Sequence, residues 1–289
     1  MPRSTKRHYR PTRDAVTARR AALFDIVEGS RPATVRQTFY QATVQGLVAK
    51  SEQGYAVIKN DLTIMRRAHQ LPYDWLADNT RWQRRPNTFR DIASALQDTA
   101  AFYRKSLWDD ADSYVEIWLE KDALSGVVYP ITELNDVALM VARGYSSLSF
   151  LYSAAEYIGS LEVPAYIYHL GDYDPSGVNA GEKIEQTLRE TAPDAKIHFQ
   201  RLAVTPQQIR RWNLPTRPTK TTDSRAKKFK SKVSVELDAI PPNQLRELVA
   251  KAIERHLPRA QFEVLRAAEE SEREILQNLV NGLTQDGDE

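Results

Sequence analysis

The chain has 289 residues, 42% of them hydrophobic and 27% charged, so it is long enough to bury a core, and we expect two domains. With 11 glycines and 15 prolines it is not collagen-like or of low complexity, and no stretch is apolar enough for a membrane span or a secretory signal. Cysteine is absent, which excludes disulfides, thiolate nucleophiles and Cys-based metal sites. We expect a cytoplasmic globular protein whose metal, if it binds one, is held by oxygen ligands.

The formal net charge of +2 conceals two basic segments, residues 1–31 and 201–232, and an acidic C-terminal part. Such segments suit a polyanion, because Lys and Arg contacts to phosphate supply most sequence-independent affinity for nucleic acid. A solvated loop would have the same composition, so both interpretations stay open. If the second segment contacts DNA, the candidate side chains are Lys220, Arg225, Lys227, Lys228 and Lys230.

The sequence of the N-terminal part predicts a basic arm, residues 1–20, followed by a helical domain, residues 21–81. Apolar residues repeat at helical spacing in three stretches, and Thr34 is a plausible N-cap for the second. The third stretch is basic and carries the candidate DNA contacts Lys59, Arg66 and Arg67. Two helices joined by a turn, the second of them basic, can set one helix in a major groove, although such pairs are also common in domains that never bind DNA.

From residue 113 onward, short apolar runs alternate with helical stretches, which predicts a parallel sheet covered on both faces. This α/β domain spans residues 113–258 and includes a basic loop, residues 214–232. Residues 82–112 would link the two halves, and residues 259–289 form an acidic C-terminal helix or tail. The expected strands are Tyr114–Leu119, Val137–Ala142, Ala165–Leu170 and Ile197–Val204.

Acidic residues follow two of these strands, where ligands gather in open α/β sheets. Glu120 comes after the first strand, and Asp172 and Asp174 come after the third. A divalent cation would relieve their repulsion, and Mg²⁺ prefers one or two carboxylates together with waters and phosphate oxygens. Asp-Tyr-Asp-Pro-Ser-Gly is also a good polar turn for capping a helix, but a third acid at the same edge favours a cation. Glu116, inside a strand, is a lesser candidate.

A hydroxyl that could act as a nucleophile lies on the second predicted helix. Without cysteine, covalent attachment to DNA would need Ser, Thr or Tyr, and Tyr40 has Arg36 four residues before it on the same helix face. The guanidinium could clamp a phosphate and stabilise the attacking phenolate. Judged by spacing alone, a Phe-Tyr pair on an amphipathic helix is more often part of a core.

Two motifs carry a resemblance to a known family. Glu120-Lys121 followed by Asp172-x-Asp174-Pro175-x-Gly177 resembles the Toprim domain, most closely that of the topoisomerase VI A subunit and its meiotic double-strand-break relatives. The segment Arg36–Tyr40 is similar to the Arg-x-x-Tyr/Phe-Tyr segment of that family's winged-helix domain. The resemblance covers about residues 30–255, and within it the fragments Arg143–Tyr145 and Glu236–Ala239 are interpreted as scaffold.

The resemblance implies an α/β Toprim domain with a Rossmann-like parallel sheet, preceded by a mainly helical winged-helix DNA-binding domain. It implies Mg²⁺ bound by Glu120, Asp172 and Asp174, with Tyr40 as the nucleophile and Arg36 in support. The implied enzyme is a type IIB topoisomerase A-like isomerase that cleaves double-stranded DNA through a 5′-phosphotyrosyl intermediate. It works as a homodimer in which the tyrosine of one protomer meets the metal site of the other.

The chain also departs from that family. It is short, its N-terminal arm is brief, and it has no ATPase domain, so strand passage would need a separately encoded ATPase B-type subunit. These features resemble a compact stand-alone relative, nucleoid-associated and carried by a phage or plasmid. Two alternatives remain: a hydrolytic Toprim nuclease in which Tyr40 is core, and a DNA-binding module that does not cleave. A primase ranks last, because there is no cysteine for a zinc module.

Overall fold

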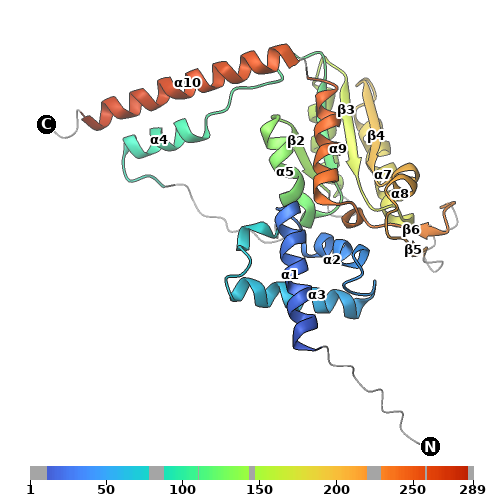
Figure 1. Cartoon of the computed structure of the whole chain (residues 1–289). Helices are drawn as coiled ribbons and strands as arrows, with labels where there is room; N and C mark the ends of the chain where they lie inside the picture. The colour runs from blue at the N-terminus through green and yellow to red at the C-terminus, as the bar shows by residue number, and fades with distance from the viewer. Residues whose placement is uncertain are drawn as a thin grey trace, which may run out of the picture.

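The structure is a computed structural model, and it combines a helical N-terminal part with an α/β part (Figure 1). No helix among the residues it describes is both long and apolar enough to cross a bilayer. The described residues are 12–77, 88–109, 111–142, 147–219, 229–257 and 259–285.

Three helices make up the N-terminal part: α1 (Arg13–Ser30), α2 (Val35–Val44) and α3 (Glu52–Arg67). Hydroxyl side chains cap all three, and Thr34 forms the expected cap of α2 as part of a capping box with Gln37. Apolar side chains from each helix form a common core. Asp61 of α3 is buried and accepts hydrogen bonds from Arg19 (2.7 Å) and Arg20 (3.0 Å), which ties α3 to α1.

A helical region ahead of an α/β sheet is therefore confirmed, whereas the winged-helix assignment stays a prediction. Within residues 12–77 the chain also forms a short 3₁₀ turn, η1 (Tyr73–Trp75), and an isolated bridge between Ala33 and Leu76. These described residues contain no pair of strands that could form a wing.

The predicted parallel sheet is present, with the strand order β2-β1-β3-β4. Its strands match the apolar runs in the sequence, with two identical and two shorter at their ends. They are β1 (Tyr114–Leu119), β2 (Ala138–Val141), β3 (Ala165–Leu170) and β4 (Ile197–Ala203).

Helices cover both faces of the sheet, which is why the strands are apolar on both sides. On one face, residues such as Ile117 and Leu170 pack in a core with α5 (Ser125–Leu134) and α9 (Pro242–Glu254). On the other face, Trp118 and Ile167 pack in a core with α6 (Leu148–Gly159) and α7 (Pro175–Thr191).

The segment 82–112, expected to link the two halves, contains the helix α4 (Ile92–Phe102). It packs along the C-terminal helix α10 (Arg259–Gln285), and the pair extends away from the body (Figure 1). Directly after α4, Lys105 Nζ lies 2.7 Å from Glu272 Oε1 of α10, and Arg273 Nη2 donates to the carbonyl of Tyr103 over 2.9 Å.

The N-terminal helices lie against the carboxyl end of the sheet (Figure 1). Contacts come from the 3₁₀ turn η4 (Leu237–Ala239) and from α9: Gln37 Nε2 donates to the carbonyl of Ile240 (3.4 Å), and Arg246 Nη1 to that of Pro32 (3.0 Å). At the same end are the short helix α8 (Pro206–Arg211) and a two-stranded hairpin, β5 (Arg217–Pro218) with β6 (Val233–Ser234).

We expect Asp61→Asn to lower the free energy of unfolding by about 1–3 kcal/mol, because Arg19 and Arg20 would lose the buried charge that they share. Chemical denaturation followed by circular dichroism measures this loss. Asp98→Asn, at an exposed position of α4, is the control and should stay within about 0.5 kcal/mol of wild type. Equal stability of the two variants would show that Asp61 does not tie α3 to α1.

Candidate active site

Glu120 and Asp172 meet at the carboxyl end of the sheet because β1 and β3 are neighbours and Leu119 pairs in register with Leu170. The backbone N–H of Asp172 donates to Glu120 Oε2 over 3.0 Å. The carboxylate of Asp172 in turn accepts a hydrogen bond from the backbone N–H of Leu237 at Oδ1, over 2.8 Å. The structure thus brings these two predicted acids together.

Two glycines make room for the Glu120 carboxylate. A Cβ atom at Gly171 would lie 2.5 Å from Glu120 Oε2 and 2.6 Å from His169 Cε1, and one at Gly177 would lie 2.9 Å from the same oxygen. Side chains at either position would push Glu120 away from Asp172. The glycines of the Gly-Asp-Tyr-Asp-Pro-Ser-Gly segment are therefore needed for close packing around the carboxylate.

Asp174 serves as the N-cap of α7 and also forms an ion pair. Its Oδ1 accepts from the N–H of Gly177 (2.8 Å), as in the helix-capping alternative, and its Oδ2 lies 3.2 Å from Arg217 Nη2. In the described part of the chain no three His, Asp or Glu side chains converge closely enough to form a metal-binding group. The close pair is Glu120 and Asp172, and one oxygen of Asp174 is directed to Arg217.

Arg201, which the sequence analysis did not identify, holds the acidic loop in place from β4. Its guanidinium is largely buried and donates to the carbonyls of Gly171 (2.9 Å), Gly177 (3.2 Å) and Asp172, and its Nε donates to that of Val204 (3.0 Å). The strand that carries it, Ile-His-Phe-Gln-Arg-Leu-Ala, also has His198 and Gln200, so no local signal in the sequence singles out Arg201.

A second group of charges that the sequence analysis missed surrounds Lys121. Its ammonium forms an ion pair with Asp238 and lies 3.6 Å from Asp172 Oδ1 and 3.7 Å from Glu236 Oε2. Asp238 also accepts a hydrogen bond from the hydroxyl of Thr34, the N-cap of α2, over 3.2 Å. The segment Glu236–Ala239, interpreted as scaffold, therefore connects the end of the sheet to the helix that carries Arg36 and Tyr40.

Arg36 and Tyr40 both lie beside this charged group. Arg36 Nη1 is 2.7 Å from Glu236 Oε2. Tyr40 is only 4% exposed, and its ring packs against Phe39 and lies below the ammonium of Lys50, 5.3 Å from the ring centroid. The pKa of the Tyr40 hydroxyl is raised above its ordinary value by burial and by the Glu236 carboxylate. Arg36 and Lys121 oppose this shift without cancelling it. Tyr40 is thus a core residue in this arrangement and also a neighbour of the acidic group.

A cleft of about 560 Å³ lies between α3 and the end of the sheet. It brings together residues that were predicted separately, since Arg36, Lys59, Arg66 and Asp172 all line it. Arg66 Nε is buried there and makes no hydrogen bond within the described residues. Arg67 is exposed but does not line the cleft.

The basic loop begins and ends next to the acidic segment. Tyr173 forms a bridge with Val235, and its ring lies 5.0 Å from that of Phe229. Lys230, one residue further on, is exposed. The other predicted DNA contacts of this loop lie outside the described residues: Lys220, Arg225, Lys227 and Lys228.

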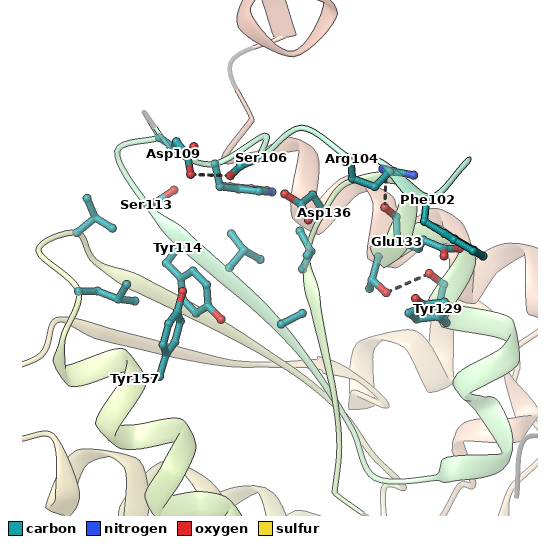
Figure 2. A pocket seen from close by; sticks show the side chains of 18 of the residues that line it. Phe102, Arg104, Ser106, Asp109, Ser113, Tyr114, Tyr129, Glu133, Asp136 and Tyr157 are labelled. Carbon is teal, nitrogen blue, oxygen red and sulfur yellow. Dashed lines mark hydrogen bonds between the residues drawn. The ribbon is translucent and has the colours of Figure 1, made fainter. Parts of the chain in front are cut away.

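A larger cavity of about 920 Å³ lies at the opposite edge of the sheet, near the amino ends of β1 and β2 (Figure 2). Polar groups in its wall partner one another: Ser106 donates to Asp109 (2.6 Å) and Arg104 to the carbonyl of Glu133 (3.0 Å). None of the predicted site residues lines this cavity. The cleft at the carboxyl end is therefore the better candidate, because parallel sheets place their sites there.

Burial, with a further contribution from Asp172, raises the pKa of the Glu120 carboxyl to about 7. Burial also raises the pKa of Asp172, although Lys121 opposes that shift. Two neighbouring carboxyls with raised pKa values form a site where a bound cation would favour ionisation.

No protein-family model matches the sequence, and no curated protein matches it either. Function is therefore inferred from the residues of this site.

We expect Glu120→Gln to raise the melting temperature of the metal-free protein at pH 8. The folded Glu120 has a pKa of about 7, above that of the unfolded chain, so wild type loses stability as the pH rises from about 4.5 to 7 and the carboxyl ionises. The gain should be on the order of 1–3 kcal/mol at pH 8 and should vanish near pH 4.5. Thermal unfolding in chelator measures it, with Glu162→Gln, at an exposed position, as the control. A gain that does not depend on pH would show that ionisation of the buried carboxyl is not its cause.

Proposed function

We propose that the protein is a Mg²⁺-dependent DNA transesterase of the topoisomerase VI A type. Tyr40 is the nucleophile, Arg36 supports it, and cleavage of double-stranded DNA leaves a 5′-phosphotyrosyl end. The observation that carries the proposal is the packing of α2 against the sheet end: Arg36 contacts Glu236 at 2.7 Å, next to the group that contains Asp172 and Lys121.

The carboxylates fit a hard divalent cation. Glu120 and Asp172 are adjacent, and each has a raised pKa. Mg²⁺ needs only one or two carboxylates when waters and phosphate oxygens complete its shell, so this pair would hold it, while Asp174 stays the N-cap of α7 and the partner of Arg217. When bound, the ion supplies positive charge beside the reacting phosphate.

The chain's own side chains supply the rest of the chemistry. Burial raises the pKa of Tyr40 and Arg36 opposes that shift, and the guanidinium of Arg36 would stabilise the charge that grows on an attacked phosphate. Lys59 and Arg66 line the cleft and would contact the DNA backbone there. We extend the proposal to a winged-helix role for residues 21–81, with α3 as the DNA-facing helix, and to a homodimer, because cutting both strands requires two tyrosines.

We expect Tyr40→Phe to abolish covalent protein–DNA adducts while leaving DNA binding within about twofold of wild type, because the substitution removes only the hydroxyl. Supercoiled plasmid is incubated with protein and Mg²⁺, denatured, and analysed with and without protease. Linear DNA that appears only after protease indicates the adduct. Tyr103→Phe is the control. Tyr103 lies between α4 and α10, away from the candidate site, so this variant should cleave DNA like wild type. Adducts formed by Tyr40→Phe at the wild-type rate would exclude Tyr40.

The same assay separates the alternatives. Free 5′-phosphate ends without attached protein would indicate a hydrolytic nuclease. Tight duplex binding with no cut in any divalent metal would indicate a binding module. Cleavage that persists in chelator, or in Asp172→Asn, would remove the metal from the mechanism.

A mixing experiment tests which protomer supplies the tyrosine. In a homodimer with sites shared between protomers, Tyr40→Phe and Asp172→Asn are each inactive, but a mixed dimer retains one intact site. Random mixing should therefore restore nicking with a covalent adduct to about a quarter of the wild-type level. If each protomer uses its own tyrosine, the mixture stays inactive.

A further inference from the structure

One carboxylate contacts three cations that come from three different parts of the chain. Glu236 Oε2 lies 2.7 Å from Arg36 Nη1 of α2 and 3.7 Å from Lys121 Nζ, just after β1. Its other oxygen, Oε1, lies 3.4 Å from Arg217 Nη1 of β5. Burial opposes the charge of Glu236, but these three cations together hold the pKa of its carboxyl below the ordinary value.

The three cations remain open to solvent, whereas the carboxylate between them does not. The exposed fractions are 39% for Arg36, 29% for Lys121 and 35% for Arg217, against 10% for Glu236. Arg36 and Lys121 line the cleft between α3 and the sheet, so an anion in that cleft would reach them directly. The guanidinium of Arg36 is also held from one side by the ring of Tyr55, 5.1 Å away.

Two guanidiniums and an ammonium around one anionic group are also the donors that a phosphate needs, because Arg forms paired hydrogen bonds with phosphate as it does with carboxylate. Other carboxylates already accompany two of the cations. Lys121 is paired with Asp238, and Arg217 Nη2 with Asp174, so both would stay in place if Glu236 moved away. The cation site is thus held in place apart from the group that fills it.

We propose that Arg36, Lys121 and Arg217 form a binding site for a backbone phosphate of nucleic acid, which Glu236 fills in the free protein and leaves when the phosphate binds. This inference rests on the proposed function for its choice of ligand. What is new is that an internal anion, Glu236, competes for the site and has to be displaced by the DNA.

The test is the affinity of Glu236→Gln for a short DNA duplex, measured by fluorescence anisotropy in chelator so that no cleavage occurs. The amide keeps the size of the side chain and removes its charge, so the affinity should rise by about tenfold, as when one charge-assisted contact no longer competes. Glu247→Gln, with the same change in net charge at an exposed site of α9, is the control and should bind like wild type.

Affinity of Glu236→Gln equal to that of Glu247→Gln, or weaker, would overturn the proposal. If Glu236→Gln fails to fold, Arg217→Gln provides the second test: it should weaken duplex binding about tenfold relative to Arg211→Gln, in the exposed last turn of α8. Equal binding by those two variants would also overturn the proposal.

Titration with inorganic phosphate distinguishes the source of the ligand. If Glu236→Gln binds the duplex more tightly than wild type and binds inorganic phosphate only at millimolar concentration or more weakly, a nucleic-acid site is supported. If it binds inorganic phosphate tightly but shows no higher affinity for the duplex, the proposal is overturned. Because every measurement is of binding, absence of cleavage would contradict the transesterase and leave this result standing.

Discussion

Five carboxylates lie near the carboxyl end of the sheet, and the arrangement around them depends on balancing their mutual repulsion: Glu120, Asp172, Asp174, Glu236 and Asp238. The compensating cations come from separate parts of the fold. Arg36 belongs to the N-terminal helices, Lys121 to the end of β1, Arg201 to β4 and Arg217 to the hairpin. Charge balance therefore also holds the helical part against the sheet.

The cations do not neutralise all five carboxylates equally, and the carboxylate with the least compensation is the one where chemistry can occur. Asp238 and Glu236 are each in contact with cations, whereas Glu120 accepts a backbone N–H and has a pKa raised to about 7. The glycines at 171 and 177 allow this crowded placement, and Arg201 fixes the loop around it. A site that carries such a cost without an evident structural gain is typical of function.

The sequence predicted what depends on local pattern. The strands were found nearly to the residue, because parallel strands buried on both faces are continuous apolar runs, and the cap at Thr34 and the closeness of Glu120 to Asp172 followed from general rules. Contacts between distant segments were not predicted. Arg36 meets Glu236 across 200 positions and Lys121 meets Asp238 across 117, and no local periodicity records either pairing. The double role of Asp174 shows the same limit: its cap is local and its pairing with Arg217 is not.

Tyr40 is buried by packing in the apolar core of the helical part, and its hydroxyl feels the charges at the sheet end. With Glu236 held by Arg36, the nearest charges include an acid that opposes formation of the phenolate, and the ring is packed in the core of the helical part. An attacking Tyr40 would need a way out of that core. Exchange of Glu236 for a phosphate puts one anion in place of another, but it breaks the contact between Glu236 and Arg36 and so would loosen α2 from the sheet end. Burial of the tyrosine is therefore compatible with a nucleophile that becomes competent only once DNA is bound.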